Sequence, residues 1–374
     1  MSSNSQVNLS PDVYFYLPNG SMDQFPASYN MTGLLAEVSE REYEAIAEES
    51  EAHFAKFTVA LPRKAKLTLL AALTLRADRD VLRIFSDYLN AVFCCDDVFD
   101  GETQSAGPAA AARSTQQLMA MLRDPQNADS FHDALPQARV FCDLWTRAVK
   151  MMPGQGSIDR FLALTEQYLV GTCLESRIIE DLANAPYIVD GALDIEAYID
   201  HRCIVAGVMP CLPFSELALG HDIPEELMRD PAVRRMERCT TEIVALSNDI
   251  YSFNKEQAAG QPTNLAVLAM THLGLGVQAA LDLVDARLQA AGARFLAEKS
   301  ALSGRLGPMI DGYVRAMEDW VVGSHRWHVL SGRYFGDDAG RVKPGARCRI
   351  RLLPRRSQAA AAAGAQAPLP DRRG

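Results

Sequence analysis

Two separate segments of the chain carry oxygen-bearing side chains at helical spacing. The first is DDVFD, residues 96–100, which follows the apolar stretch FSDYLNAVFCC. On a helix, Asp96 and Asp100 are four residues apart and share one face, with Asp97 beside it. Three carboxylates at the end of an apolar helix are costly to keep unless something cationic meets them. This segment therefore predicts a cation site.

The second segment is NDIYSFNKE, residues 248–256. Asn248, Ser252 and Glu256 are spaced four residues apart, so a helix places their oxygens within an arc of about 80° over roughly 12 Å. Taken alone, Asn248 is better explained as a helix cap or a surface residue, but its register with Ser252 and Glu256 favours a shared site. Amide, hydroxyl and carboxylate oxygens suit Mg²⁺ and not zinc or copper.

The elements that must position these segments are helices. Apolar residues recur at i, i+3 and i+4 along most of the chain, and Pro and Gly signals separate the periodic stretches. No stretch shows convincing strand alternation, and no internal repeat is present. We predict one all-α domain of about eleven helices. The predicted helices cover residues 34–55, 62–80, 81–100, 108–123, 133–151, 157–184, 194–219, 225–258, 263–271, 275–300 and 305–332.

Composition narrows the class of protein. The chain has 374 residues and a formal charge of −10, which argues against nucleic acid as the main partner. Its eight cysteines include no C-x-x-C pair, a pattern typical of buried thiols in a reduced compartment. The N-terminus lacks a basic segment followed by an apolar one, and no later run reads as an integral membrane span. A cytoplasmic protein is therefore expected.

The two ends of the chain differ from its helical part. Residues 1–33 are turn-rich and polar, and they predict an N-terminal arm before an all-α domain at 34–336. Residues 341–374 hold nine Arg or Lys and one acid, a net charge of +8. This composition predicts a basic, disordered tail over 337–374, and deletion of residues 341–374 should leave activity nearly unchanged. A solvated extension is the favoured interpretation, and a tether to a membrane surface or an acidic partner is the alternative.

Together, the two motifs resemble those of the class I terpene synthases, or terpene cyclases, and in particular the fungal-type sesquiterpene synthases. DDVFD matches the family's D-D-x-x-D motif, and NDIYSFNKE matches N-D-x-x-S-x-x-K-E at every defining position. Arg333 and Tyr334, which follow Trp327, match a C-terminal Arg-Tyr pair of the family. The resemblance covers roughly residues 80–335. It implies a single-domain helical bundle of the class I terpenoid synthase type, enclosing an apolar active-site cavity.

The resemblance also implies a substrate and a cofactor. The substrate would be an acyclic isoprenoid diphosphate; the single-domain size favours farnesyl diphosphate, and geranyl diphosphate stays open. Three Mg²⁺ ions held between the two motif helices would neutralise the departing diphosphate. The implied metal ligands are Asp96, Asp100, Asn248, Ser252 and Glu256, with Asp97 in an outer position.

Diphosphate also requires hydrogen-bond donors. The resemblance assigns this role to Lys255, Arg333 and Tyr334, the last two as a clamp that closes on the substrate. Arg202 lies 46 residues before Asn248, where the family keeps a diphosphate-sensing arginine.

The helix that carries Arg202 is expected to break at Ala206 and Gly207. In the family, such a break aims a backbone carbonyl at the carbocation. Val205 departs from the pattern, because some relatives have an acidic or polar residue there. Arg177 is a rival to Arg202, although a surface salt bridge is its favoured role.

After ionisation, the enzyme must hold a carbocation away from water, which requires apolar walls and aromatic faces. Phe93, one turn before Asp96, is expected to point into the cavity, and Trp320 is expected to share its face with Trp327. Ordinary core packing is an equal alternative for each ring.

Two other functions stay open at this point. A chain-elongating prenyl diphosphate synthase shares the fold and the first motif, but it needs a second aspartate-rich motif that NDIYSFNKE does not supply. A non-catalytic helical binding protein would have no need of the triad together with Lys255 and the Arg333–Tyr334 pair. The sequence leaves the choice between monomer and homodimer open, and it does not define the product.

Overall fold

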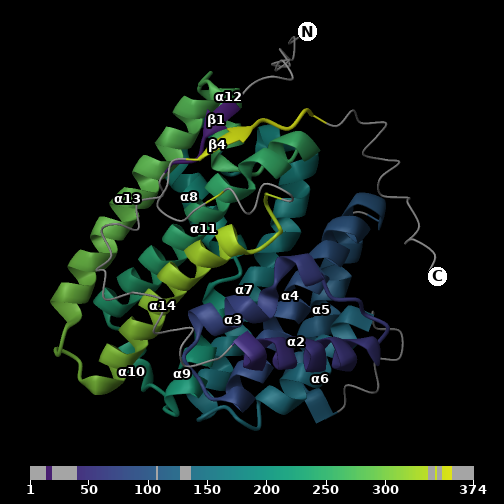
Figure 1. The fold of residues 1–374 in the computed structure, drawn as a ribbon, viewed down its shortest axis with the longest axis vertical. Helices are drawn as coiled ribbons and strands as arrows, with labels where there is room; N and C mark the ends of the chain where they lie inside the picture. Colours follow the sequence, from purple (N-terminus) through teal and green to yellow (C-terminus); the bar gives the residue numbers. More distant parts are fainter. Residues whose placement is uncertain are drawn as a thin grey trace.

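The computed structural model describes residues 14–18, 40–106, 108–126, 136–335, 342 and 348–355. Over these residues the chain is a bundle of α-helices, which confirms the predicted all-α class (Figure 1). The α-helices are α2 (Glu40–Ala55), α3 (Leu67–Thr74), α4 (Arg79–Ala106), α5 (Pro108–Arg123), α6 (Pro136–Ala148), α7 (Gln155–Glu180), α8 (Ile195–Val205), α9 (Pro213–Leu219), α10 (Glu225–Met228), α11 (Pro231–Ala259), α12 (Leu265–His272), α13 (Val277–Leu302) and α14 (Pro308–Leu330).

Short elements connect these helices. The 3₁₀ turns are η3 (Arg63–Ala65), η5 (Leu182–Asn184) and η6 (Met209–Cys211). The strands are β1 (Tyr14–Tyr16), β2 (Ile188–Val189), β3 (Ala192–Leu193) and β4 (Arg349–Arg351). β1 pairs with β4, and β2 pairs with β3, both antiparallel. The expectation that the chain contains no strands is therefore wrong for these segments, which are too short to show alternation.

Local sequence signals explain where the long helix α11 begins and ends. Asp230 caps it by accepting a hydrogen bond from the backbone N–H of Ala232 at 2.8 Å, and Pro231 occupies the first turn. Gly260 ends it in the left-handed conformation at φ +78°, which costs glycine little. The Asp-Pro pair also separates α10 from α11 within the predicted 225–258 helix.

The buried apolar side chains form one large cluster that extends from Phe15 to Leu352. Helix α4 lies within it, packed against α3, α5 and α6, and its residues from Val81 to Cys94 are nearly all buried. Helix α11 packs against α13 and α14. Gly323 lets α14 lie directly on α3, because a Cβ there would be 2.0 Å from the Leu73 carbonyl oxygen. The two motif helices are thus core elements.

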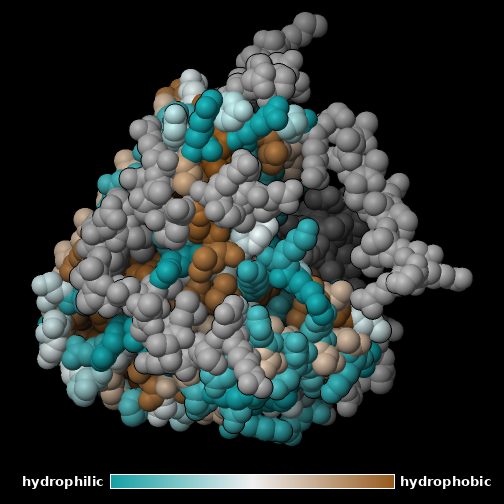
Figure 2. All heavy atoms as spheres, in the orientation of Figure 1, coloured by the Kyte–Doolittle hydropathy of each residue, from teal (hydrophilic) through white to brown (hydrophobic). Residues whose placement is uncertain are grey.

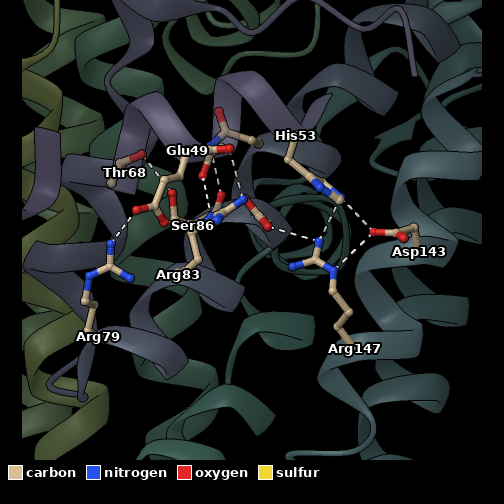
Figure 3. Close-up of polar contacts among 11 residues, drawn as sticks. Glu49, His53, Thr68, Arg79, Arg83, Ser86, Asp143 and Arg147 are labelled. Carbon is tan, nitrogen blue, oxygen red and sulfur yellow. Dashed lines mark hydrogen bonds and ion pairs between the residues drawn. The ribbon is translucent and has the colours of Figure 1, made fainter. Parts of the chain in front are cut away.

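An ionic network ties α4 to α2 and α6 (Figure 3). Asp87 is fully buried on α4 and accepts hydrogen bonds from Arg83 Nε at 3.1 Å and Arg147 Nη2 at 3.0 Å. Arg147 of α6 also donates to Asp143, whose carboxylate contacts His53 of α2 at 2.7 Å. Removing one partner of such a buried charge pair costs about 3–5 kcal/mol. The network therefore holds α4 in place at Asp87, six residues before Phe93.

The described side chains around α2 and α6 are mainly hydrophilic on the face shown in Figure 2. Helices in this region expose one face and bury the other, as the moderate amphipathic pattern of α2 and α6 predicts.

The structure corrects the expected disordered tail over 337–374. Residues 348–355 are ordered, and β4 pairs with β1 near α12 and α13 (Figure 1). Ile350 and Leu352 are buried in the main core, opposite the buried Phe15 of β1. The sequence pattern did not reveal this because only a few apolar residues anchor the strand and its partner lies at the other end of the chain. Residues 356–374 lie outside the described residues.

Side chains of α11 and α13 hold the β1–β4 pair in place. Asn254 of α11 donates to the Arg351 carbonyl at 2.9 Å and accepts from the Leu353 N–H at 2.8 Å, so its amide acts as a strand partner. Gln257 donates to the Leu353 carbonyl at 2.7 Å. Gln278 of α13 accepts a hydrogen bond from the Tyr16 N–H and donates one to the Tyr16 carbonyl. We call residues 14–17 and 348–353 the terminal clasp.

Within the described residues, one stretch, Ile195–Leu219, is long and apolar enough by composition to cross a membrane. It is divided among α8, η6 and α9, and 61% of its apolar window is buried inside the protein. The stretch therefore serves as part of the helical core.

Candidate active site

A cavity of about 220 Å³ lies between α3, α4, α7, α8, α11 and α14. Its wall is largely apolar and aromatic, and a group of polar side chains faces it from α8, α11, α14 and the segment that follows. The lining residues are Leu70, Leu89, Val92, Phe93, Tyr168, Arg202, Val205, Ala206, Gly207, Val208, Cys211, Val244, Ala245, Asn248, Trp320, Ser324, Trp327, His328, Arg333 and Tyr334. The predicted site residues among them come from four separate regions of the sequence.

The two predicted wall aromatics both line this cavity. Phe93 contacts Trp327 edge-on, with ring centroids 6.0 Å apart. Trp320 is buried and packs edge-on against Phe85 at 5.9 Å. Trp320 and Trp327 share the cavity-facing side of α14, as their seven-residue spacing predicts. Their effect on a carbocation stays a prediction.

The aspartate-rich segment lies in α4, as the sequence predicts. Leu89, Val92 and Phe93, which precede it in the same helix, line the cavity. The side chains of Asp96, Asp97 and Asp100 lie outside the described residues, so their assignment as metal ligands stays a prediction.

Ser252 and Glu256 lie one turn apart on α11 and share a hydrogen-bond partner. Asn264 Nδ2 donates to Glu256 Oε2 at 2.9 Å and approaches Ser252 Oγ at 3.5 Å. Burial raises the pKa of Glu256, and the nearby Asp249 carboxylate raises it further. A cation at Glu256 would offset both effects.

Asn248, one turn earlier on α11, belongs to a second network. Its Oδ1 accepts a hydrogen bond from Arg202 Nη2 at 2.8 Å, and its Nδ2 donates to the Tyr334 hydroxyl at 3.0 Å. His328 Nε2 lies 3.5 Å from the same Nδ2. Asn248 therefore connects the predicted diphosphate sensor with the predicted C-terminal clamp.

Arg202 is fixed by a buried carboxylate. Its Nε donates to Asp249 Oδ1 at 3.0 Å, and Asp249 Oδ2 accepts from the Tyr198 hydroxyl at 2.7 Å and from the Leu265 N–H at 3.1 Å. Burial alone would lower the pKa of Arg202, but the Asp249 carboxylate raises it overall. Arg202 is thus cationic and half-buried at the cavity. Its rival Arg177 is exposed and does not line the cavity.

Arg333 and Tyr334 also face the cavity. The Arg333 guanidinium lies over the Phe93 ring, 4.9 Å from its centroid. Tyr334 is buried, and its ring meets Trp327 edge-on at 5.7 Å. Burial raises the pKa of Tyr334, which keeps its hydroxyl protonated. Lys255, by contrast, is exposed on α11 and does not line the cavity.

The predicted break after Arg202 is present. Helix α8 ends at Val205, Gly207 adopts φ +70°, and η6 begins at Met209. Ala206 and Gly207 line the cavity, and the Gly207 carbonyl accepts a hydrogen bond from Cys211 Sγ at 3.1 Å. The role of this backbone toward a carbocation stays a prediction.

Sequence reasoning missed three residues that shape the site. Asp249 lies within the second motif, next to Asn248, and this position could have marked it as a site residue. Asn264 precedes the apolar run LAVLA, which is a helix N-cap signal. His328 is buried and neutral, because burial lowers its pKa well below the ordinary value, and no sequence signal distinguishes it.

The donor set on α11 fits a hard divalent cation. Asn248, Ser252 and Glu256 offer only oxygen ligands, and their spacing along one helix face is retained in the structure. Among the residues whose side chains are described, no group of three or more His, Cys, Asp or Glu gathers to hold a metal. Two of the three triad members are an amide and a hydroxyl, so this result does not count against the triad.

Comparisons with known proteins agree with this geometry. A family model described as terpene synthase family 2, C-terminal metal binding, matches residues 87–293. The chain is 31% identical over 268 residues to an alpha-muurolene synthase of Coprinopsis cinerea, a match that covers 70% of this chain and 60% of that protein. It is 30% identical over 293 residues to sesquiterpene synthase 6 of Postia placenta, covering 75% of this chain and 78% of that protein.

Solved structures show the same fold at low sequence identity. A variant of cucumene synthase matches with a TM-score of 0.66 and 22% identity over 78% of this chain and 96% of that one. Germacradien-4-ol synthase from Streptomyces citricolor matches with a TM-score of 0.62 and 19% identity over 86% of this chain and 99% of that one.

The helical bundle and its polar-capped apolar cavity define a terpenoid-synthase fold. The chain belongs to terpene synthase family 2 and is a metal-binding, fungal-type class I terpene synthase, a carbon–oxygen lyase. The resemblance inferred from the two motifs is confirmed.

Proposed function

We propose that this terpene synthase converts an acyclic isoprenoid diphosphate, preferably farnesyl diphosphate, into a cyclic sesquiterpene and diphosphate. One observation carries the proposal: a single cavity joins an aromatic wall, formed by Phe93 and Trp320, to the guanidinium groups of Arg202 and Arg333. The sesquiterpene synthases among the relatives support a farnesyl chain over a geranyl chain.

The reaction begins with heterolysis of the allylic C–O bond. The bonding electron pair leaves with the diphosphate oxygen, and an allylic carbocation stays in the cavity. Arg202 and Arg333 would offset the charge on the leaving group, and the Tyr334 hydroxyl would donate a hydrogen bond to it. We assign Lys255 to the same role once the site has closed. Loss of a proton from the cyclised cation then gives a neutral hydrocarbon.

We assign divalent metal ions, expected as three Mg²⁺, to Asp96 and Asp100 on α4 and to Asn248, Ser252 and Glu256 on α11. Bound ions of this kind neutralise charge that develops on a departing diphosphate. The family's metal-binding description supports divalent metal use.

Arg202 and the metal site are linked through Asn248. The Oδ1 atom that would ligate a metal accepts a hydrogen bond from Arg202 at 2.8 Å. A diphosphate in the cavity would offer Arg202 Nη2 a charged partner in place of the neutral Asn248 oxygen, which would leave that oxygen open to a metal. We infer that binding of the diphosphate frees the first ligand of the triad.

The cavity wall has a separate task. Once ionised, the hydrocarbon chain must meet no water and no nucleophile, and the lining from Leu70 to Trp327 is mostly apolar. The π-faces of Phe93 and Trp320 are proposed to stabilise cationic intermediates. The shape of the cavity decides which product forms, and residue types alone do not define that shape.

Prenyl chain elongation is the second enzymatic candidate. It would require α11 to present carboxylates in place of the amide of Asn248 and the hydroxyl of Ser252. A non-catalytic binding protein is the third candidate, and the arrangement of Arg202, Asn248 and Tyr334 around one cavity counts against it.

We further propose that residues 34–336 form the catalytic domain, that the enzyme acts in the cytoplasm, and that it functions as a monomer or a homodimer without nucleic acid or integral-membrane partners. The apolar stretch Ile195–Leu219 is mostly buried, which supports the absence of a membrane span.

The test is incubation of the purified protein with Mg²⁺ and, separately, geranyl, farnesyl and geranylgeranyl diphosphate, followed by analysis of volatile products and released diphosphate. We expect cyclic sesquiterpenes from farnesyl diphosphate and no turnover after metal chelation. Adding isopentenyl diphosphate tests elongation, which would appear as longer diphosphates. Elongated products, or the absence of turnover with every substrate, would overturn the proposal.

A further inference from the structure

Asn264 is a fully buried residue in the short connection between α11 and α12. It caps α12: its Oδ1 accepts hydrogen bonds from the backbone N–H groups of Ala266 at 2.9 Å and Val267 at 3.4 Å. Since backbone N–H groups can only donate, these two contacts fix which end of the amide is the oxygen. The Nδ2 group therefore points away from α12.

The Nδ2 group of Asn264 points at the metal-ligand face of α11. It donates to the Asp249 carbonyl at 2.8 Å and to Glu256 Oε2 at 2.9 Å, and it approaches Ser252 Oγ at 3.5 Å. An amide has two N–H hydrogens, so the two short contacts use both of them. One side chain thereby joins the start of α12 to Glu256 of the triad and to the α11 backbone at Asp249.

This arrangement restricts the Glu256 carboxylate. A free Glu side chain has many rotamers, and holding it in one costs free energy that metal binding would otherwise have to supply. Asn264 is fully buried and holds the Oε2 atom of the half-buried Glu256 in place, and its own orientation is set by α12. Partners of this kind commonly orient metal ligands and change affinity by about 10–100-fold.

We propose that Asn264 is a positioning residue for the divalent-metal site, setting Glu256 before the metal binds. The inference rests on the proposed metal triad on α11. It assigns α12 a function beyond packing, because the start of that helix determines the ligand geometry.

The capping role and the positioning role can be separated by substitution. In Asn264→Ser, the hydroxyl caps a helix about as well as the amide, but it is too short to donate across to α11. Asn264→Thr is a second variant of the same kind, and its methyl group fills part of the vacated space. Asp194→Ser is the matched control, because Asp194 caps α8 through the Ala197 N–H and is exposed.

The measurement is Mn²⁺ binding by electron paramagnetic resonance in the presence of inorganic diphosphate, without isoprenoid substrate. We expect Asn264→Ser and Asn264→Thr to raise the Mn²⁺ dissociation constant about tenfold or more. Asp194→Ser should leave it unchanged. Thermal unfolding of each variant shows whether the fold is retained, and one of the two Asn264 variants is sufficient for the test.

Two outcomes distinguish this inference from the metal assignment itself. If Glu256→Ala weakens Mn²⁺ binding but both Asn264 variants bind like wild type, Asn264 is only a helix cap and the inference is overturned. If Glu256→Ala and Asn248→Ala bind Mn²⁺ like wild type, the triad assignment fails first, and the Asn264 inference fails with it.

Discussion

Asn248 donates a hydrogen bond from Nδ2 to the hydroxyl of Tyr334 over 3.0 Å, joining residues 86 positions apart. The other end of the same amide accepts from Arg202. A predicted metal ligand, a predicted diphosphate sensor and a predicted clamp are therefore connected by direct contacts. The effects of substituting any two of these residues should therefore be non-additive.

Tyr334→Phe removes the hydroxyl and leaves Asn248 Nδ2 without this partner. We expect kcat/KM to fall about tenfold and the losses of Tyr334→Phe and Asn248→Ala to be non-additive by about 0.5–3 kcal/mol in a double-mutant cycle. Tyr251→Phe is the matched control, since its buried hydroxyl contacts His325 and does not line the cavity. Strict additivity would show that the contact has no part in turnover.

Asn248→Ala and Glu256→Ala should raise the Mg²⁺ concentration needed for half-maximal activity and lower kcat. Each change removes one proposed ligand, while the predicted ligands on α4 persist. The measurement is steady-state turnover across a Mg²⁺ titration, with chelated enzyme as the zero point. Wild-type metal dependence in both variants would contradict the triad assignment.

Much of this site was predictable from the sequence because the signals are local. The register of Asn248, Ser252 and Glu256 requires only helical spacing, and the break after Arg202 follows from Gly207 and the nearby Met-Pro pair. Contacts across the fold were not predictable. The Asn264 contacts to α11 depend on how a connecting turn packs, which residue types do not encode.

The C-terminal segment is a second case in which a long-range contact could not be predicted from the sequence. Composition correctly describes a chain end that cannot form its own core, but β4 completes a core that already exists. Asn254 and Gln257 supply hydrogen bonds that a free strand edge would lack. That pairing is long-range, so only the folded structure reveals it.

Ending the chain after residue 355 should leave stability and turnover unchanged, whereas ending it at 341 should lower the free energy of unfolding by about 3 kcal/mol or more. The shorter chain loses the buried side chains of Ile350 and Leu352, each worth about 1.5–3 kcal/mol. This revises the expectation that all of 341–374 is dispensable. Urea unfolding and turnover of both chains provide the test, and equal stability would show that the terminal clasp is not stabilising.

Stability should fall as the pH drops below about 6.5. Burial lowers the pKa of His201 and of His325 to about 4, whereas histidine in an unfolded chain titrates near 6.5. Between these values the unfolded state binds more protons, so each residue costs up to about 3 kcal/mol by pH 4. This penalty is absent above pH 6.5 and reaches its full size as the pH approaches 4.

His201→Leu should flatten this pH dependence, because His201 Nε2 has no hydrogen-bond partner among the described residues and its ring packs against Tyr187. Urea unfolding between pH 7 and pH 4.5 gives the slope. The matched control is replacement of the exposed His221 by Leu. An unchanged slope in His201→Leu would mean that other groups dominate the acid sensitivity.

Asp96→Asn and Phe93→Leu, one helical turn apart on α4, should fail in different ways. Asp96 is predicted to hold the ions that draw the diphosphate away, so its loss should depress every product together. Phe93→Leu keeps most of the apolar volume but removes a π-face worth about 0.5–2 kcal/mol to a nearby cation. A difference of that size redistributes flux between competing cations by about two- to thirtyfold.

The structure adds a second effect to Phe93→Leu, because the Arg333 guanidinium lies 4.9 Å from the Phe93 ring centroid. Total turnover should therefore fall modestly, while the product mixture shifts towards acyclic or early-quenched terpenes. Phe85→Leu is the matched control, since Phe85 is a fully buried ring of α4 outside the cavity lining. If active Phe93→Leu enzyme kept the wild-type product ratio, Phe93 would be an ordinary core ring, and the aromatic wall would have to be assigned to Trp320 and Trp327 alone.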